Sequence, residues 1–388
     1  MPRKTDIKLP KAFDIPNIRS AKGLRGKRVL LRLDLNVPLV RGKVADISRI
    51  ESALPTLKFL RLAGARTVIV SHLGDGETSL KEVARKLNSF IRVGFIPGLL
   101  DAKAAAAVAA LPESGILMLE NLRSDAGERE NSTFFALSLS RLGDIYVNDA
   151  FSASHRVHAS VVSLPRFLES FIGFQFEREL YELSKSLTPE KPFLFIIGGA
   201  KPETKLPLIK KYARVADKIF VGGALMNSFF KSEGYEVGES IAQDAGDDLA
   251  ELARRKNFIL PGDVVVEGGK VKKVGEIDKN DIVRDIGPKA LRALVGSIKG
   301  KKEIIFNGPL GNYELGFDKS TKETLKAMAK SRARTVVGGG DTLAIVSRLK
   351  IGKRLSFVST GGGAMLEFLS RGTLPGIEAL KKHKTIDK

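Results

Sequence analysis

Glycine-rich turns in the second half of the chain are the residues best suited to chemistry by type and spacing. Each turn follows an apolar, strand-like run and precedes a helical pattern; the four are Gly198–Gly199, Gly222–Gly223, Gly338–Gly340 and Gly361–Gly363. Glycine lets a ligand approach the backbone closely, and a helix N-terminus offers unpaired N–H groups to an anion. A single turn could equally serve tight packing of a strand against a helix. Four of them at one sheet edge predict a site for a phosphate-rich ligand.

Asp341 and Thr342 follow the third turn directly, at the expected start of a helix. Asp341 could cap that helix, a position that aspartate favours. It could also face a magnesium ion bound to nucleotide phosphates, and the two roles share one geometry. The chain contains no Walker A sequence and no GxGxxG after its first strand. Both absences argue against an ordinary P-loop NTPase and a dinucleotide-dependent dehydrogenase.

Basic side chains stand at expected strand ends in the first half of the chain. They are Arg32, Arg49, Arg123 and Arg156, with the imidazoles of His72 and His158. Taken singly, each arginine would be a surface or ion-paired residue. Four of them converging on one strand edge would form a cage for a small phosphorylated carboxylate, because the guanidinium fork matches carboxylate and phosphate oxygens.

The overall charge points to polyanionic partners. The 388 residues carry a formal net charge of +20, with eight Lys or Arg in residues 1–27 and four Lys in the tail KKHKTIDK. Nucleic acid, nucleotides and phosphorylated metabolites are all candidates, so a basic nucleic-acid-binding protein is the rival to an enzyme. The lack of cysteine excludes disulfides and thiolate catalysis and fits a cytoplasmic setting. No run is apolar enough for a signal or membrane segment.

The order of the elements predicts two α/β domains. Strand-like runs such as RTVIVSHLG alternate with helical patterns, and the strands are continuously apolar, as in parallel sheets covered on both faces. FQFERELYELSKSL is typical of one long helix, and the stretch 235–302 contains a small hairpin-rich insertion. We therefore expect two doubly wound, Rossmann-like parallel-sheet domains joined by a long helix, with a cleft between them. The expected boundaries are 1–172, 173–188 for the joining helix, 189–370, and 371–388 for a tail.

Nine motifs occur in order from residue 32 to residue 368: RLDLNVP, SHLG, LENLR, VNDAFSASHRVHAS, GGAKPETK, DIGPK, FNGPLGNYE, GGGDT and STGGGAMLEFL. This series resembles that of the 3-phosphoglycerate kinases, and the short loops resemble an archaeal member. The resemblance implies a first domain that binds 3-phosphoglycerate or 1,3-bisphosphoglycerate and a second that binds ADP or ATP with Mg²⁺. It also implies that the tail returns to the first domain.

The resemblance assigns roles to positions of this sequence. The substrate positions are Asp34, Asn36, Arg49, His72, Arg123 and Arg156. The nucleotide positions are Lys201, Lys205, Gly222, Gly223, Asn307, Glu314, Gly338, Gly339, Gly340, Asp341 and Thr342, with Asp341 toward the metal. The catalytic positions are Arg49, Lys205, Gly361, Gly362 and Gly363. The N–H groups of the last turn would face the phosphoryl group during transfer.

The implied reaction is reversible phosphoryl transfer between 1,3-bisphosphoglycerate and ADP, a step of glycolysis and gluconeogenesis, in line and with closure of the two domains. The attacking oxygen is already ionised near neutral pH. No general base is needed, and the task is to align two anions and screen their charge. We expect a cytoplasmic monomer or dimer, without membrane contact and without a specific nucleic acid.

One motif departs from the family pattern. SHLGDG has Asp75 where the family has a substrate-binding arginine. Either Asp75 places negative charge near the substrate, or the short loop turns its side chain into solvent, where Asp-Gly is a turn signal. We favour the turn. The departure leaves a catalytically weakened relative as an alternative to an active enzyme.

Overall fold

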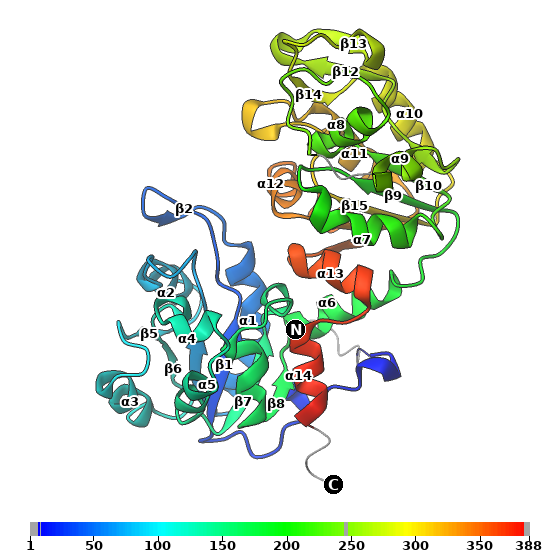
Figure 1. Ribbon diagram of the computed structural model, residues 1–388. Helices are drawn as coiled ribbons and strands as arrows, with labels where there is room; N and C mark the ends of the chain where they lie inside the picture. The colour runs from blue at the N-terminus through cyan, green and yellow to red at the C-terminus, as the bar shows by residue number, and fades with distance from the viewer. Residues whose placement is uncertain (1–6, 8, 244–246, 384–388) are drawn as a thin grey trace. The chain divides into compact units, whose positions relative to one another are not determined.

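The computed structural model describes residue 7, residues 9–243 and residues 247–383. The chain divides into two compact units: unit 1 is Met1–Ser184 with Arg371–Lys388, and unit 2 is Lys185–Ser370. Each unit is a parallel sheet surrounded by helices (Figure 1), which confirms the expected fold class. Residues 1–6 and 8 of the basic N-terminal stretch and residues 384–388 of the basic tail lie outside the described residues.

Unit 1 contains a six-stranded parallel sheet in the order β5-β6-β4-β1-β7-β8. Its strands are β1 (Arg28–Leu33), β4 (Arg66–Val70), β5 (Gly94–Phe95), β6 (Ile116–Met118), β7 (Ile145–Asp149) and β8 (Glu169–Ile172). The chain winds outward from β1 in both directions, because β1 pairs with β4 on one side and β7 on the other. All carboxyl ends therefore meet at one edge, where ligands of such sheets bind. β8 was not expected from the sequence.

The helices of unit 1 follow from apolar spacing and from capping residues. Ile50, Leu57 and Leu60 recur at helical spacing in α1 (Ser48–Leu62) and are buried in the core. Asp101 caps α3 (Ala102–Ala109) and Ser132 caps α5 (Thr133–Ser140), each by accepting a backbone N–H. Other regular elements of unit 1 are α2 (Lys81–Asn88), α4 (Ala126–Arg129), η1 (Lys11–Phe13), η2 (Ile18–Ser20), η3 (Leu122–Ser124), η4 (Phe151–Ala153), η5 (Ala159–Ser163), η6 (Leu164–Arg166), and the hairpin of β2 (Leu39–Val40) and β3 (Lys43–Val44).

A buried carboxylate ties three elements of unit 1 together. Asp149, at the end of β7, accepts from Thr56 Oγ1 at 2.6 Å and from the backbone N–H of Phe176 at 2.9 Å. Thr56 belongs to α1, and Phe176 lies in the first turn of α6 (Phe174–Lys185), the long helix predicted from the sequence. Burial raises the pKa of Asp149 to about 7, although these hydrogen bonds favour the ionised form.

We expect Asp149 to make the protein less stable as pH rises from about 4 to about 7. The raised pKa means that the folded state holds a proton that the unfolded state has already lost. The contribution amounts to about 1.4 kcal/mol for each pKa unit. In urea unfolding at pH 5 and pH 7.5, Asp149→Asn should remove this loss. Asp144→Asn is the control, because Arg28 lowers the pKa of Asp144 and its contribution has the opposite sign. Equal pH dependence in wild type and Asp149→Asn would contradict the prediction.

The end of the chain belongs to unit 1. Helix α14 (Pro375–His383) contacts η5, η6 and β8, and Gly376 N donates to Ser154 O at 2.9 Å. A Cβ at Gly376 would lie 2.8 Å from Ser154 Cβ, so the helix packs closely there. Ile377 and Leu380 are fully buried in this contact.

Unit 2 repeats the doubly wound plan. Its parallel sheet has the order β11-β10-β9-β15-β16-β17. The strands are β9 (Phe193–Ile197), β10 (Lys218–Val221), β11 (Phe258–Ile259), β15 (Glu303–Asn307), β16 (Arg334–Gly338) and β17 (Phe357–Val358). Every residue of β9 and β15 is buried, as expected of central strands covered on both faces.

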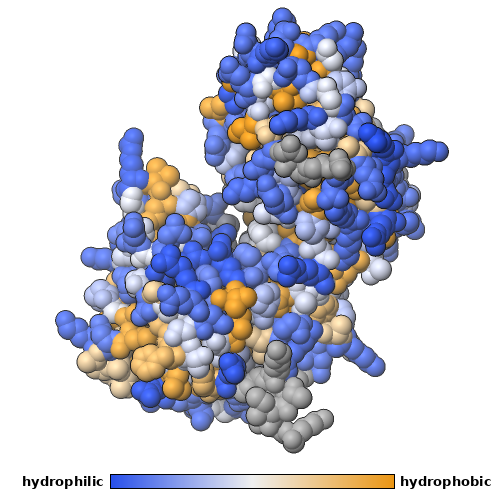
Figure 2. All heavy atoms as spheres, in the orientation of Figure 1, coloured by the Kyte–Doolittle hydropathy of each residue, from blue (hydrophilic) through white to orange (hydrophobic). Residues whose placement is uncertain are grey.

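The helices of unit 2 are α7 (Pro202–Tyr212), α8 (Gly223–Ser232), α9 (Asp247–Ala253), α10 (Pro288–Ile298), α11 (Lys319–Lys330), α12 (Gly340–Arg348) and α13 (Gly363–Arg371). The predicted hairpin-rich insertion is an antiparallel sheet of β12 (Asp263–Val266), β13 (Val271–Lys273) and β14 (Val283–Ile286). On the face shown in Figure 2, hydrophilic side chains predominate and apolar ones form scattered groups. Within the described residues, no helix has the length and apolarity of a membrane span.

Candidate active site

Polar side chains follow the strands of unit 1 at their carboxyl ends. Asp34 and Asn36 come after β1, His72 after β4, Arg123 lies in η3 after β6, and Arg156 follows β7 by way of η4. Because the strands are parallel, these positions share one edge of the sheet. The structure thus brings together the substrate residues expected from the sequence.

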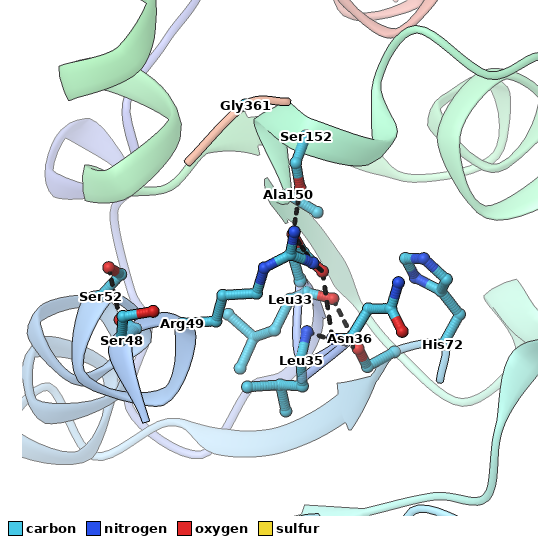
Figure 3. Close-up of polar contacts among 12 residues, drawn as sticks. Leu33, Leu35, Asn36, Ser48, Arg49, Ser52, His72, Ala150, Ser152 and Gly361 are labelled. Atoms are coloured by element: carbon cyan, nitrogen blue, oxygen red, sulfur yellow. Dashed lines mark hydrogen bonds and ion pairs between the residues drawn. The ribbon is translucent and has the colours of Figure 1, made fainter. Parts of the chain in front are cut away.

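Arg49 reaches the same edge from the first turn of α1. Its Nη1 donates to the Asp34 carboxylate, 2.8 Å from Oδ1 and 2.7 Å from Oδ2. Ser152 Oγ also donates to Asp34. Figure 3 shows the Arg49 side chain extending from α1 toward Ser152, with Asn36 and His72 on the other side. The Arg49 side chain remains 29% exposed, which leaves it accessible to a ligand.

The positive charge of this cluster exceeds its local negative charge. Burial and the charges of Arg32, Arg123, Arg49 and Arg156 hold the pKa of His72 well below its usual value. Burial, Arg156 and Arg32 also lower the pKa of Arg123. Cations that lower one another's pKa values repel one another, and a bound anion reduces this repulsion. The edge therefore suits a small, multiply charged anion.

Arg32 and His158 differ from the other members of the cluster. Arg32 is buried and donates to protein atoms, among them His72 Nδ1. His158 Nδ1 lies 3.8 Å from the buried carboxylate of Glu128, and burial lowers the pKa of His158 to about 4. The expectation that four arginines would contact the ligand is therefore wrong for Arg32, which faces the interior.

Asp75 occupies an exposed turn between two glycines with positive φ, Gly74 at 55° and Gly76 at 116°. This confirms the interpretation as a turn residue. The loop packs on Arg123, because Arg123 Nη1 donates to Gly74 O at 2.6 Å. The negative charge of Asp75 acts on Arg123 and opposes the lowering of its pKa. Asp75 therefore acts on Arg123 through its charge, while its side chain lies in the exposed turn.

All four glycine turns lie between a strand and a helix at one edge of the unit 2 sheet. The backbone approaches most closely at Gly198 and Gly223. A Cβ at Gly198 would lie 2.8 Å from Gly308 O, and one at Gly223, whose φ is +61°, would lie 2.7 Å from Pro309 O. Tight packing is therefore part of what these glycines do, as the alternative interpretation held.

A cavity of about 210 Å³ opens beside these turns. Its apolar lining includes Met226, Ile241, Ile282 and Val283, and its polar lining includes Tyr313, Glu314 and Asp341. Apolar walls with a few polar groups are typical of small-molecule sites. Among the expected nucleotide residues, Gly223, Glu314 and Asp341 line the cavity directly.

Lys205 supplies a buried cation near the cavity. Its Nζ donates to Lys201 O at a long 3.4 Å. Among the described residues, Asp341 and Glu203 act on Lys205 through their charges. Burial and the charge of Lys201 lower the pKa of Lys205, while the charge of Asp341 raises it. Because a buried ammonium needs strong acceptors, Lys205 is suited to an anionic ligand.

Two further polar groups stand beside the Gly338–Gly340 turn. Asn307 Nδ2 and Thr342 Oγ1 are buried and have no hydrogen-bond partner within the described residues. Each lies 3.6 Å from the place that a Cβ at Gly339 would take. Buried polar groups are almost always paired in folded proteins, so this turn is built to receive a ligand oxygen or a water.

Asp341 is not the cap of its helix, and that alternative is wrong. α12 begins at Gly340 with Gly339 as its cap residue, at a φ of 97°. This conformation favours glycine and moves the acid into the first turn, where the helix dipole still favours it. The Tyr313 hydroxyl donates to Asp341 Oδ1 at 3.3 Å, and the carboxylate lines the cavity.

Some expected residues do not line the cavity. A Cβ at Gly222 would lie 2.6 Å from Leu310 Cδ2, so this glycine serves packing. The turn Gly361–Gly363 stands after β17, the last strand of the sheet, where Gly361 N donates to Ser359 Oγ at 3.1 Å. Conversely, Tyr313 was missed although it lies within the motif FNGPLGNYE.

Two α/β units, each with a site for an anion at the carboxyl edge of a parallel sheet, are the architecture of a phosphotransferase that binds its two substrates separately. The chain belongs to the phosphoglycerate kinase family, whose model matches residues 18–371.

Similar proteins bear the same name. The phosphoglycerate kinase of Moorella thermoacetica is 38% identical over 92% of this chain and 97% of its own length. That of Akkermansia muciniphila is 41% identical over 92% and 95%. The solved structure of phosphoglycerate kinase from Coxiella burnetii matches with a TM-score of 0.80 at 34% identity, covering 95% of this chain and 99% of that one. The one from Pyrococcus horikoshii has a TM-score of 0.88 at 29% identity, covering 96% and 100%.

Proposed function

We propose that this chain catalyses the reversible transfer of a phosphoryl group between 1,3-bisphosphoglycerate and ADP, giving 3-phosphoglycerate and ATP. The observation that carries the proposal is the cluster of basic residues at the carboxyl edge of the unit 1 sheet, where Arg49, Arg123 and Arg156 lie with His72. A coupled assay with 3-phosphoglycerate and MgATP tests it, and we expect turnover despite Asp75. No turnover in either direction would contradict the proposal.

In this proposal the unit 1 edge binds the phosphoglycerate. Arg49, Arg123 and Arg156 face its phosphate and carboxylate, since paired guanidinium donors match these oxygens. Asp34 is held by Arg49 and Ser152, which orients its carboxylate for the substrate hydroxyl. In this proposal Asn36 and His72 are neutral groups beside the cations. They orient the substrate through directed hydrogen bonds, whereas the cations supply the charge.

The unit 2 cavity binds the nucleotide. The apolar side chains of Met226, Ile282 and Val283 suit a base, and Glu314 suits the ribose. We assign the phosphates to the edge formed by Lys201, Lys205 and the Gly338–Gly340 turn with Asn307 and Thr342. The cations and unpaired polar groups found there support this assignment.

Asp341 is the residue that would hold Mg²⁺. Within the described residues no group of three or more His, Cys, Asp or Glu could hold a metal by itself. A single carboxylate lining a nucleotide cavity fits magnesium, which proteins bind through one or two carboxylates together with substrate phosphates. When bound, the ion would neutralise phosphate charge.

The transfer step requires alignment and not proton removal. The attacking oxygen belongs to a carboxylate or to a nucleotide phosphate, both ionised near neutral pH, so no general base is involved. Arg49 and Lys205 would neutralise the charge of the phosphoryl group as it moves. We assign the N–H groups of Gly361–Gly363 to the same charge. A cytoplasmic enzyme without specific nucleic-acid or membrane contacts remains our prediction.

Asp341→Asn should raise the apparent magnesium requirement by roughly 10–100-fold, the range seen when a group supporting a metal is lost. Binding of 3-phosphoglycerate alone should not change, because that ligand belongs to unit 1. Titration of the rate with Mg²⁺ and calorimetry with 3-phosphoglycerate measure the two. Asp248→Asn, which removes an exposed carboxylate paired with Lys210, is the control. An unchanged magnesium requirement would remove Asp341 from the metal site.

We expect the two substrates together to make the particle more compact than either does alone. The proposed phosphoglycerate and nucleotide sites lie on different units, so transfer requires closure, which also excludes water. Small-angle scattering of the apo, binary and ternary states measures the radius of gyration. Equal radii in all four ligand states would argue against closure.

A further inference from the structure

Arg32 is a charged residue near the carboxyl end of the buried strand β1, and only 1% of its surface is exposed. Its Nε donates to Ser160 Oγ at 3.0 Å and its Nη1 donates to Leu33 O. Its Nη2 lies 3.0 Å from Nδ1 of His72. The guanidinium is therefore occupied by protein atoms in three directions and is buried.

The contact with His72 determines where the imidazole carries its proton. A guanidinium has five N–H donors, no acceptor, and does not lose its proton in proteins. Nδ1 of His72 must therefore accept this hydrogen bond with its lone pair. A neutral imidazole has one donor and one acceptor nitrogen, so the hydrogen of His72 is on Nε2.

The charges around His72 oppose a second proton. Arg32 from β1, Arg49 from α1, Arg123 from η3 and Arg156 from the loop after β7 all act in that direction. The negative groups nearby are engaged elsewhere or act at a distance. Asp34 pairs with Arg49, Glu128 with Ser160, and Asp75 lies in the exposed turn.

A buried chain of hydrogen bonds holds Arg32 in place. Ser160 Oγ, which accepts from Arg32, donates to Glu128 Oε1 at 2.6 Å, and Ser160 N donates to Glu128 Oε2 at 2.8 Å. Glu128 is fully buried and supplies the counter-charge. Tyr146 Oη fixes the same segment by donating to Ser160 O at 2.6 Å. Arg32 donates in both directions, to His72 Nδ1 and to Ser160 Oγ, and the Ser160 hydroxyl passes the chain on to Glu128. Because the guanidinium has no acceptor, Nδ1 of His72 can only accept.

We propose that Arg32 is a positioning residue that locks His72 as the neutral tautomer with its hydrogen on Nε2, so that His72 offers an anionic ligand a directed donor whose charge does not change with pH. The part that concerns the ligand rests on the proposed function. The part that concerns the tautomer does not, since it follows from the protein's own hydrogen bonds.

Imidazole ¹⁵N spectroscopy of the unliganded protein tests the tautomer directly. The chain has only four histidines, His72, His155, His158 and His383, so His72→Gln assigns the signal. We expect a protonated Nε2 and an unprotonated Nδ1, unchanged from pH 5.5 to pH 8. Arg32→Met should let part of the His72 population carry its hydrogen on Nδ1, because Nδ1 no longer receives a hydrogen bond from the guanidinium. Arg156→Met should lower the local charge and leave the tautomer intact, because it removes a charge and not the hydrogen bond.

Steady-state kinetics test the consequence for the ligand. In Arg32→Met, the KM for 3-phosphoglycerate should rise above the wild-type value, because part of His72 then has no hydrogen on Nε2 to donate, while kcat changes less than KM. If Arg32→Met does not fold, the wild-type spectrum still tests the tautomer of His72, and the His72 variants still test its contribution to the KM. His72→Ala should raise KM by roughly 10–100-fold, the scale of a hydrogen bond to a charged group. His72→Gln, whose amide keeps one acceptor and one donor, should recover most of that loss.

The outcomes separate the two proposals. A wild-type His72 with its hydrogen on Nδ1, or doubly protonated at pH 7, would overturn the inference even if the enzyme is active. An inactive wild type with the expected tautomer would leave the role of Arg32 intact and contradict the proposed function. An unchanged KM in a folded Arg32→Met whose spectrum shows the hydrogen on Nδ1 would show that the tautomer does not serve the ligand.

Discussion

Lys205→Ala is expected to lower kcat by about 10²–10³-fold, with a smaller change in the KM for either substrate. A loss of this size, roughly 2.7–4 kcal/mol, is what one preorganised donor contributes to a transition state. Lys205 qualifies because its ammonium is buried and is held by a long hydrogen bond to Lys201 O. It is also close enough to Asp341 for their charges to interact. The Lys205 ammonium can therefore donate hydrogen bonds to the oxygens on which negative charge develops during transfer.

The matched control is Lys210→Ala on the same helix. Lys210 is exposed and paired with Asp248, so its loss should change kcat by no more than about twofold, in keeping with a surface substitution. On unit 1, Arg49→Ala should reproduce the loss of kcat, with the exposed Arg61→Ala of α1 as its control. A kcat near the wild-type value in Lys205→Ala would remove this residue from the transfer step.

Gly198→Ala is expected to weaken nucleotide binding by at least about tenfold and to lower stability by roughly 1–3 kcal/mol or more, the cost of overfilling a packed site. The added methyl group would overlap the carbonyl oxygen of Pro309 and approach Gly308 O to 2.8 Å. These are backbone atoms and cannot rotate away. The loop from Gly308 to Leu310 would have to move, and with it one wall of the cavity.

Nucleotide titration and urea unfolding measure the two effects. Gly296→Ala is the control, because this exposed glycine within α10 has no atom within 4 Å of an added Cβ and should be slightly stabilised by alanine. A Gly198→Ala protein with wild-type stability and nucleotide affinity would show that the close contact at Gly198 does not shape the site.

The sheets were predictable because their strands are long, apolar and separated by helical patterns. β8 and β11, edge strands of four and two residues, were not predicted, whereas β5 and β17, edge strands of two residues, were. Such strands exist because a neighbouring strand supplies their hydrogen bonds, which is information that local sequence does not contain. The parallel pairing then placed residues from four strand ends of unit 1 at one edge, as the doubly wound plan requires.

Residues of the candidate site could be predicted where they belong to a sequence motif. Residues that tertiary packing brings to the site could not. Gly339 takes the cap position through its φ of 97°, a backbone property that the triplet of glycines did not reveal. Ile282 and Val283 line the cavity from the antiparallel insertion, and nothing in their local sequence marks them. Arg32 did carry a signal: a charged residue within the apolar run RVLLRL must be buried with partners or lie at an edge.

Unit 1 is formed by two separate segments of the chain, and this affects how it can fold during synthesis on the ribosome. The residues of α14 that complete its core, Ile377 and Leu380, are synthesised only after the whole of unit 2. At usual elongation rates the delay is on the order of tens of seconds. During that time the nascent unit 1 lacks the helix that packs on η5, η6 and β8. Unit 2, by contrast, is one continuous segment of the chain. Unit 1 is therefore the first unit to be started and the last to be completed.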